Sequence, residues 1–100
     1  NYDGVPQVRM NGASLTTFID GDAAGLLMPS GLAMADGVLY VSDNTTSRIT
    51  AFDAGTGEVI DWLDTGLPQG ALMGLEIAAD GAIYFVDAVG NQVLRLSGLP

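Results

Sequence analysis

The sequence predicts an all-β chain made of four-stranded β-propeller blades, and three observations support this fold class. Residues 29–53 are largely repeated at residues 73–96, with the dipeptide Asp36-Gly37 recurring as Asp80-Gly81. Apolar residues recur with period two, and turn-forming residues interrupt them about every eight to twelve positions, as in short strands. Units of four short strands that repeat about every 40 to 45 residues are typical of β-propeller blades.

The first repeat unit contains four expected strands, at residues 31–35, 38–42, 48–52 and 58–63. The first of them consists of small and apolar residues, which suits the innermost position beside a crowded central channel. The second is apolar on both faces, so it must lie between two layers. The fourth has a more polar pattern, as expected of an outer edge.

The second unit repeats three of these strands, at residues 74–78, 82–86 and 92–96, without a fourth. Ahead of the first unit, residues 7–10 and 15–19 are expected to be strands on either side of Asn11-Gly12. Both residues of this dipeptide tolerate the positive φ of a type I′ hairpin turn. The total corresponds to about two and a quarter blades of four strands.

Residues 1–100 are therefore assigned to part of a single β-propeller domain. Residues 1–22 are expected to end one blade, residues 29–64 to form a complete blade, and residues 72–96 to form three strands of the next. A closed propeller needs about four to eight blades, so we expect a portion of a larger ring or one polypeptide of a split propeller. Symmetric self-assembly is disfavoured, because copies joined head to tail would leave a surplus strand at each junction.

The composition restricts the partners and the chemistry. The chain has 12 acidic and 3 basic residues and a formal charge of -9, so nucleic acid and anionic membranes are poor partners. It has no histidine, the most common general base, and no cysteine. No apolar run reaches the roughly 18 to 20 residues of a transmembrane segment. Low lysine content with many Gly, Thr, Asp and Asn residues favours an exported protein, periplasmic or extracellular.

The two units share a motif of turn-forming and core residues. In the first unit it comprises Pro29, Gly31, Leu32, Ala33, Asp36, Gly37, Tyr40, Val41, Asp43, Arg48 and Ile49, and in the second Gly74, Leu75, Asp80, Gly81, Tyr84, Asp87 and Val93. This motif resembles the NHL repeat, and the resemblance implies a portion of a six-bladed propeller.

The same blade pattern is similar to that of gluconolactonase-like and paraoxonase-like propellers. That similarity implies a central divalent cation, usually calcium, held by carboxylate and Asn side chains, one of them in a Pro-Asn-Gly-Leu motif. At the matching positions this sequence has Ser30 and Met73, and calcium prefers oxygen ligands to a thioether. No cofactor is therefore predicted, and calcium is kept as an alternative.

Three acidic side chains are the candidate metal ligands. Asp43 and Asp87 follow the second strand of each unit, where they could form an acidic rim for a cation or a basic ligand. Each could instead cap its own turn by accepting backbone N–H groups, and this interpretation is favoured. Glu76 is a charge within an apolar innermost strand, so it could face the central channel as a metal ligand or proton carrier, or only contact channel water. The other aspartates expected at the rim are Asp20, Asp22 and Asp64.

Three further features have less specific interpretations. The polar stretch at residues 20–25 begins like a calcium loop but lacks the glutamate at the twelfth position, so a flexible, solvated connection is expected. Arg48 is expected to pair with a carboxylate of a neighbouring blade. Trp62 is expected to pack between blades.

The favoured hypothesis is a non-catalytic, NHL-like β-propeller module that mediates protein–protein or ligand binding through its loop face. No catalytic or cofactor-binding residue is assigned. The expected partner is the remainder of the propeller or another protein subunit. The alternative is a fragment of a calcium-dependent lactonase-like hydrolase, with most metal ligands outside this chain and Glu76 as the internal candidate.

Overall fold

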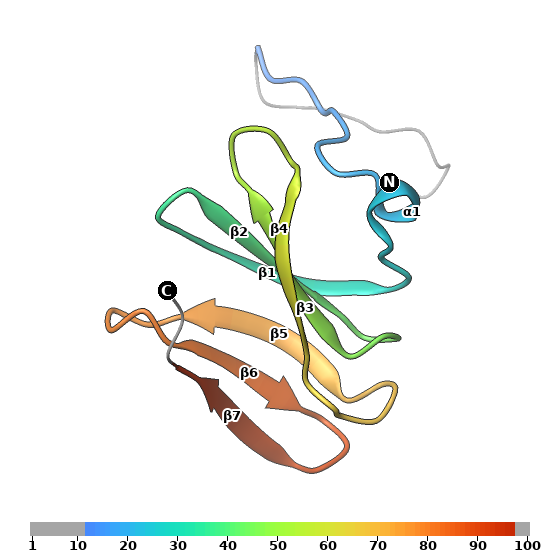
Figure 1. Cartoon of the computed structure of the whole chain (residues 1–100), viewed down its shortest axis with the longest axis vertical. Coiled ribbons are helices and arrows are strands. Elements are labelled where there is room, and N and C mark those ends of the chain that lie inside the picture. Colours follow the sequence, from blue (N-terminus) through green and yellow to red (C-terminus); the bar gives the residue numbers. More distant parts are fainter. Residues whose placement is uncertain (1–11, 98–100) are drawn as a thin grey trace.

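The computed structural model describes residues 12–97, which form two antiparallel sheets and one short helix (Figure 1). The first sheet has the spatial order β1-β2-β3-β4, and the second has the order β5-β6-β7. No helix among these residues is long and apolar enough to cross a membrane. The elements are α1 (Gly21–Ala24), β1 (Pro29–Ala35), β2 (Val38–Asp43), β3 (Arg48–Asp53), β4 (Val59–Asp64), β5 (Leu72–Ile77), β6 (Ile83–Asp87) and β7 (Gln92–Leu96).

The seven strands expected in the two repeat units all form, and the prediction of antiparallel blades of four strands and three strands is confirmed. The turn between β1 and β2 explains why Asp-Gly is repeated. Asp36 and Gly37 both have positive φ, 51° and 78°, the combination that a type I′ turn requires and that Asp and Gly tolerate. The turn therefore sets the register in which Ala35 faces Val38.

The prediction of a strand at residues 15–19 is wrong, because these residues form no regular structure. A strand needs a partner for its backbone hydrogen bonds. Within residues 12–97 no strand pairs with this segment, although Gly57 lies against Phe18. Leu15 and Phe18 are exposed, whereas Ile19 packs against the first core cluster. Residues 7–10 and Asn11 lie outside the described residues, so their predicted hairpin and the assignment of residues 1–22 stay predictions.

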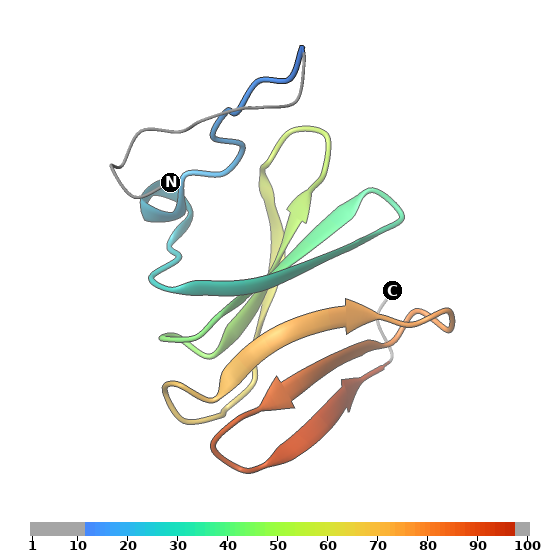
Figure 2. The same ribbon diagram turned by 180° about the vertical axis from the view of Figure 1, so that it is seen from behind.

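The connection expected at residues 20–25 is a capped helical turn instead of a flexible loop. Asp20 is the N-cap of α1, and its side chain accepts a hydrogen bond from the Asp22 N–H at 3.0 Å. Gly25 ends the helix in the left-handed conformation, with φ of 83°. After the helix, Leu26 packs on the first sheet with Leu39, Val41 and Phe52. The helix itself lies on the side of this sheet away from the second sheet (Figure 2).

The predicted burial of β2 on both faces is confirmed by two core clusters. On one face, Leu39 and Val41 pack with Leu26 and Phe52. On the other face, Tyr40 packs against a cluster that is formed mainly by the second sheet. The buried members of this second cluster are Ile49, Leu72, Ile83 and Phe85.

The two sheets meet through their inner strands, since β5 contacts β1 and β2 (Figures 1 and 2). Gly31 of β1 lies against the backbone of β5: a Cβ atom at this position would be 2.9 Å from the Gly74 Cα atom and 3.2 Å from the Leu75 nitrogen. Only glycine fits such a close approach. The small residues expected in the innermost strand thus allow the blades to pack there.

Candidate functional site

The loops after β2 and β6 and the connections that enter β1 and β5 lie at one end of the molecule and hydrogen-bond to one another. The Asn44 N–H donates to the Met28 carbonyl at 2.8 Å, and the Gly70 N–H donates to the Asn44 carbonyl at 2.9 Å. The Ala88 N–H donates to the Ala71 carbonyl at 2.8 Å. These hydrogen bonds hold the four segments together, and residues 26–28, 44–47, 65–71 and 88–91 are called the loop end.

Asp43 is fully buried beneath the loop end, and its carboxylate is saturated by backbone donors. One oxygen accepts the N–H groups of Thr45 and Thr46, both at 2.9 Å. The other accepts those of Leu27 at 2.6 Å and Met28 at 3.1 Å. Burial alone would raise the pKa of Asp43, but these four hydrogen bonds outweigh it and hold the pKa below its ordinary value. The carboxylate therefore joins the β2–β3 turn to the segment that enters β1.

Asp87 caps the equivalent turn of the second sheet and is also buried. Its carboxylate accepts the Gly90 N–H and the Gln92 side-chain amide, each at 2.8 Å. The Gly90 N–H, followed by the Gln92 amide, lowers the pKa of Asp87. The favoured interpretation of Asp43 and Asp87 as turn caps agrees with these contacts.

The aspartates expected at the rim do not gather their carboxylates around a common point. Asp43 and Asp87 each cap their own turn, Asp20 caps α1, and Asp64 accepts the Gly66 N–H at 2.9 Å. Within residues 12–97 no group of three or more acidic side chains is arranged to hold a metal ion. The loop end thus brings the backbones together without forming an acidic site.

Ser30 occupies the position where the lactonase-type propellers are expected to carry a metal ligand, and here it joins the two sheets. Its hydroxyl lies 2.8 Å from the Ser42 hydroxyl and donates to the Leu72 carbonyl at 3.1 Å. The Asn44 side-chain amide donates to the same carbonyl at 2.9 Å and lies 3.1 Å from the Met73 sulfur. Ser30 and Met73 are therefore part of the inter-sheet contact.

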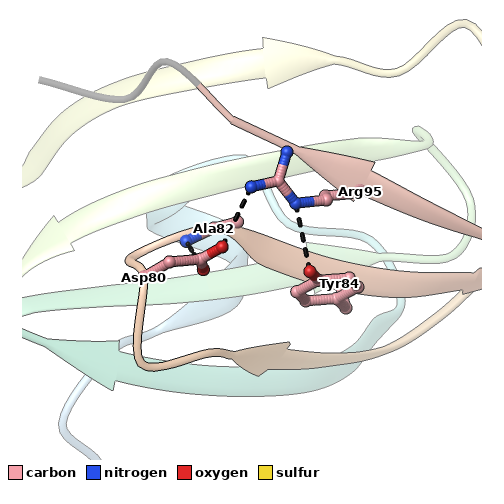
Figure 3. Close-up of polar contacts among 4 residues, drawn as sticks. All are labelled: Asp80, Ala82, Tyr84 and Arg95. Atoms are coloured by element: carbon pink, nitrogen blue, oxygen red, sulfur yellow. Dashed lines mark hydrogen bonds and ion pairs between the residues drawn. The ribbon is translucent and has the colours of Figure 1, made fainter.

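Glu76 lies on the exposed face of β5, near the opposite end of this strand from Leu72, which is the strand partner of Asp87 on β6. Its strand partner is Tyr84, and both line an open pocket of about 330 Å³. On β7, on the far side of Tyr84 from Glu76, Arg95 forms an ion pair with Asp80 at 2.9 Å and donates to the Tyr84 hydroxyl at 3.0 Å (Figure 3). This polar cluster was not predicted from the sequence. The only indication of this cluster in the sequence is that Arg95 stands where the first repeat has Ala51.

Arg48 and Trp62 interact with each other on the first sheet. The Arg48 guanidinium carbon lies 4.2 Å from the centre of the Trp62 ring, a cation–π geometry. Within residues 12–97, Arg48 forms no ion pair with a carboxylate of the kind that was expected. The ion pair found there joins Arg95 and Asp80. Trp62 remains 54% exposed, so its expected packing between blades stays a prediction.

Antiparallel sheets of up to four strands, packed face to face through their inner strands, define this chain as part of a β-propeller. Residues 26–52, which include β1, β2 and most of β3, match the family model of the NHL repeat. The prediction of NHL-type blades is confirmed over this segment.

Solved structures show the same fold. The chain is similar to glutaminyl cyclase from Myxococcus xanthus, with 20% identity and a TM-score of 0.58 over 70% of this chain and 35% of that one. It is also similar to a streptogramin B lyase, with 16% identity and a TM-score of 0.52 over 72% of this chain and 27% of that one. The chain thus spans about a third or less of these structures. No curated protein matches it.

Proposed function

We propose that this chain is part of a non-catalytic β-propeller that binds another protein or a ligand through its loop end. The observation that carries the proposal is the saturation of Asp43, whose two oxygens already accept four backbone N–H groups. A carboxylate in this state has no free acceptor for a metal and no proton to transfer near neutral pH. The absence of histidine and cysteine from the sequence supports the same conclusion.

The alternative function is a calcium-dependent lactonase-like hydrolase, with most ligands outside this chain. It is kept because Glu76 is exposed beside an open pocket and does not serve as a turn cap. The two similar structures are those of a cyclase and a lyase, so propellers of this architecture can carry enzymatic sites. Fold alone does not decide between the two functions.

Calcium titration of the intact protein, followed by melting temperature, separates the two functions. Ligand present at about 100 times its Kd stabilises the folded state by about 2.7 kcal/mol, so a hydrolase with structural or catalytic calcium should melt at a clearly higher temperature. We expect no calcium-dependent shift. A shift that Glu76→Gln abolishes and the exposed control Glu58→Gln retains would replace the proposed function with the alternative.

A further inference from the structure

A cavity of about 380 Å³ lies between the two sheets, beside the β1–β2 and β5–β6 turns and at the opposite end of the strands from the loop end. Asp36 and Tyr40 line it from the first sheet, and Asp80 and Arg95 line it from the second. This volume falls within the range of about 300 to 1,000 Å³ that is usual for small-molecule sites. The cavity is therefore large enough for a small ligand, at a place distinct from the loop end.

The charges that line this cavity do not balance. Arg95 and Asp80 form an ion pair at 2.9 Å, so their charges offset each other. This is the ion pair of residues 12–97, and it leaves the Asp36 carboxylate without a cationic partner among them. The chain as a whole has a formal charge of -9. The cavity therefore favours a cation over an anion as its occupant.

The second sheet shows how an acid and a tyrosine of this repeat hold a guanidinium group (Figure 3). Asp80 accepts a hydrogen bond from a terminal nitrogen of Arg95 at 2.9 Å, and the Tyr84 hydroxyl accepts one from the Arg95 Nε at 3.0 Å. The Ala82 N–H donates to the other Asp80 oxygen at 3.0 Å and thereby orients the carboxylate. A guanidinium group suits this arrangement because it offers several N–H donors in fixed directions.

The first sheet repeats the acid and the tyrosine but lacks the arginine. Asp36 corresponds in the repeat to Asp80, and Tyr40 corresponds to Tyr84. The strand partner of Tyr40 on β3 is Ala51, at the position where the second sheet has its arginine. The β1–β2 turn is tighter than the β5–β6 turn, yet Asp36 and Tyr40 line the same cavity. A methyl group thus replaces the guanidinium side chain, which leaves room for such a group from another molecule.

We propose that the cavity binds a small molecule with a guanidinium group, which forms an ion pair with Asp36 beside the Tyr40 ring. The bound group takes the place in the first sheet that the Arg95 side chain takes in the second. A carboxylate and a guanidinium can form two parallel hydrogen bonds, so this pair is more directional than a pair with an ammonium group. An aromatic ring adds cation–π attraction. The site does not depend on whether the intact protein is an enzyme.

Saturation-transfer difference NMR with the intact protein tests for this ligand, because the method detects weak binding through the signals of the small molecule. The probe is 1-butylguanidine, which is a cation at neutral pH, and the uncharged analogue 1-butylurea is the control. We expect saturable binding of 1-butylguanidine at about millimolar concentration, as is usual for a ligand with so few atoms, and no binding of 1-butylurea at the same concentration. Absence of saturable binding, or equal binding of the two compounds, would overturn the proposal.

Two variants test where the probe binds. Asp36→Asn removes the charge, and asparagine tolerates the positive φ of 51° at this position, so the turn is retained. Ala51→Arg supplies an internal guanidinium group that competes for Asp36. Because a hydrogen bond to a charged group is lost, we expect both variants to bind 1-butylguanidine at least about tenfold more weakly, whereas the exposed control Glu58→Gln binds it unchanged. With melting temperatures showing that the variants are folded, unchanged binding by Asp36→Asn would refute the proposal.

Discussion

Replacing Asp43 by asparagine tests whether one carboxylate holds the loop end together. The substitution keeps the size of the side chain but turns one of its two acceptor oxygens into an amide donor. Because each oxygen accepts two backbone N–H groups through part-buried hydrogen bonds, two of the four donors would lose their acceptor. Either the β2–β3 turn or the segment entering β1 is then left unpaired.

The cost follows from the number of donors affected. A fully buried donor without an acceptor costs about 1 to 3 kcal/mol, so two part-buried donors cost at most about 2 to 6 kcal/mol. The turn can relax, and losses above about 4 kcal/mol are exceptional for single substitutions, so we expect the lower half of this range. That loss is a large fraction of the roughly 5 to 15 kcal/mol that stabilises a typical domain.

Urea unfolding of the intact protein, followed by circular dichroism, measures this loss. The urea concentration at the midpoint should fall, while the dependence of the unfolding free energy on urea concentration stays unchanged. The matched control is Asp53→Asn. Asp53 also caps a turn, but it uses one oxygen for the Gly55 and Thr56 N–H groups, so asparagine can retain both bonds. If the two variants unfold at the same urea concentration, the carboxylate of Asp43 does not carry the role assigned to it.

Two further predictions concern the inter-sheet contact and pH. Gly31→Ala should lower the free energy of unfolding by about 1 to 3 kcal/mol through overpacking, because the added Cβ would meet the β5 backbone. The control Gly74→Ala should cost less, because its Cβ would contact nothing within 4 Å. Equal urea midpoints for the two variants would contradict the close approach. The lowered pKa values of Asp43, Asp53, Asp80 and Asp87 stabilise the fold above the unfolded pKa of about 4 and lose that contribution as pH falls further. Melting temperatures should therefore drop below about pH 4, and less steeply for Asp43→Asn; a melting temperature independent of pH there would refute this linkage.

The strands were predictable because their signals are local. The alternation of Val38 to Val41 and the Asp36-Gly37 turn each depend on residues that are close in sequence, and the repeat confirms them a second time. The strand expected at residues 15–19 failed because β-structure also needs a pairing partner, which a local pattern does not provide. The helix at residues 21–24 was missed because one turn is too short to show a helical period.

The roles of the candidate site residues were only partly predictable. A cap on the β2–β3 turn follows from the position of Asp43, two and three residues before its donors Thr45 and Thr46. Its bonds to Leu27 and Met28 span 16 and 15 residues, and no sequence pattern marks them. The contact of Ser30 with the Leu72 carbonyl spans 42 residues. The sequence therefore showed that Ser30 stands in place of an expected metal ligand, but it could not show that Ser30 joins the two sheets.

The close approach of Gly31 to Gly74 also has a geometric consequence for the ring. The two sheets touch through β1, β2 and β5, so this pair of sheets is held closest at its inner strands. In a closed propeller, the angle between neighbouring sheets determines how many blades fit around the axis. Since the Gly31 contact is made by the backbones of inner strands, substitutions of exposed loop side chains that keep the Asp43 and Asp87 caps leave this contact unchanged, and such positions are free to diversify for recognition.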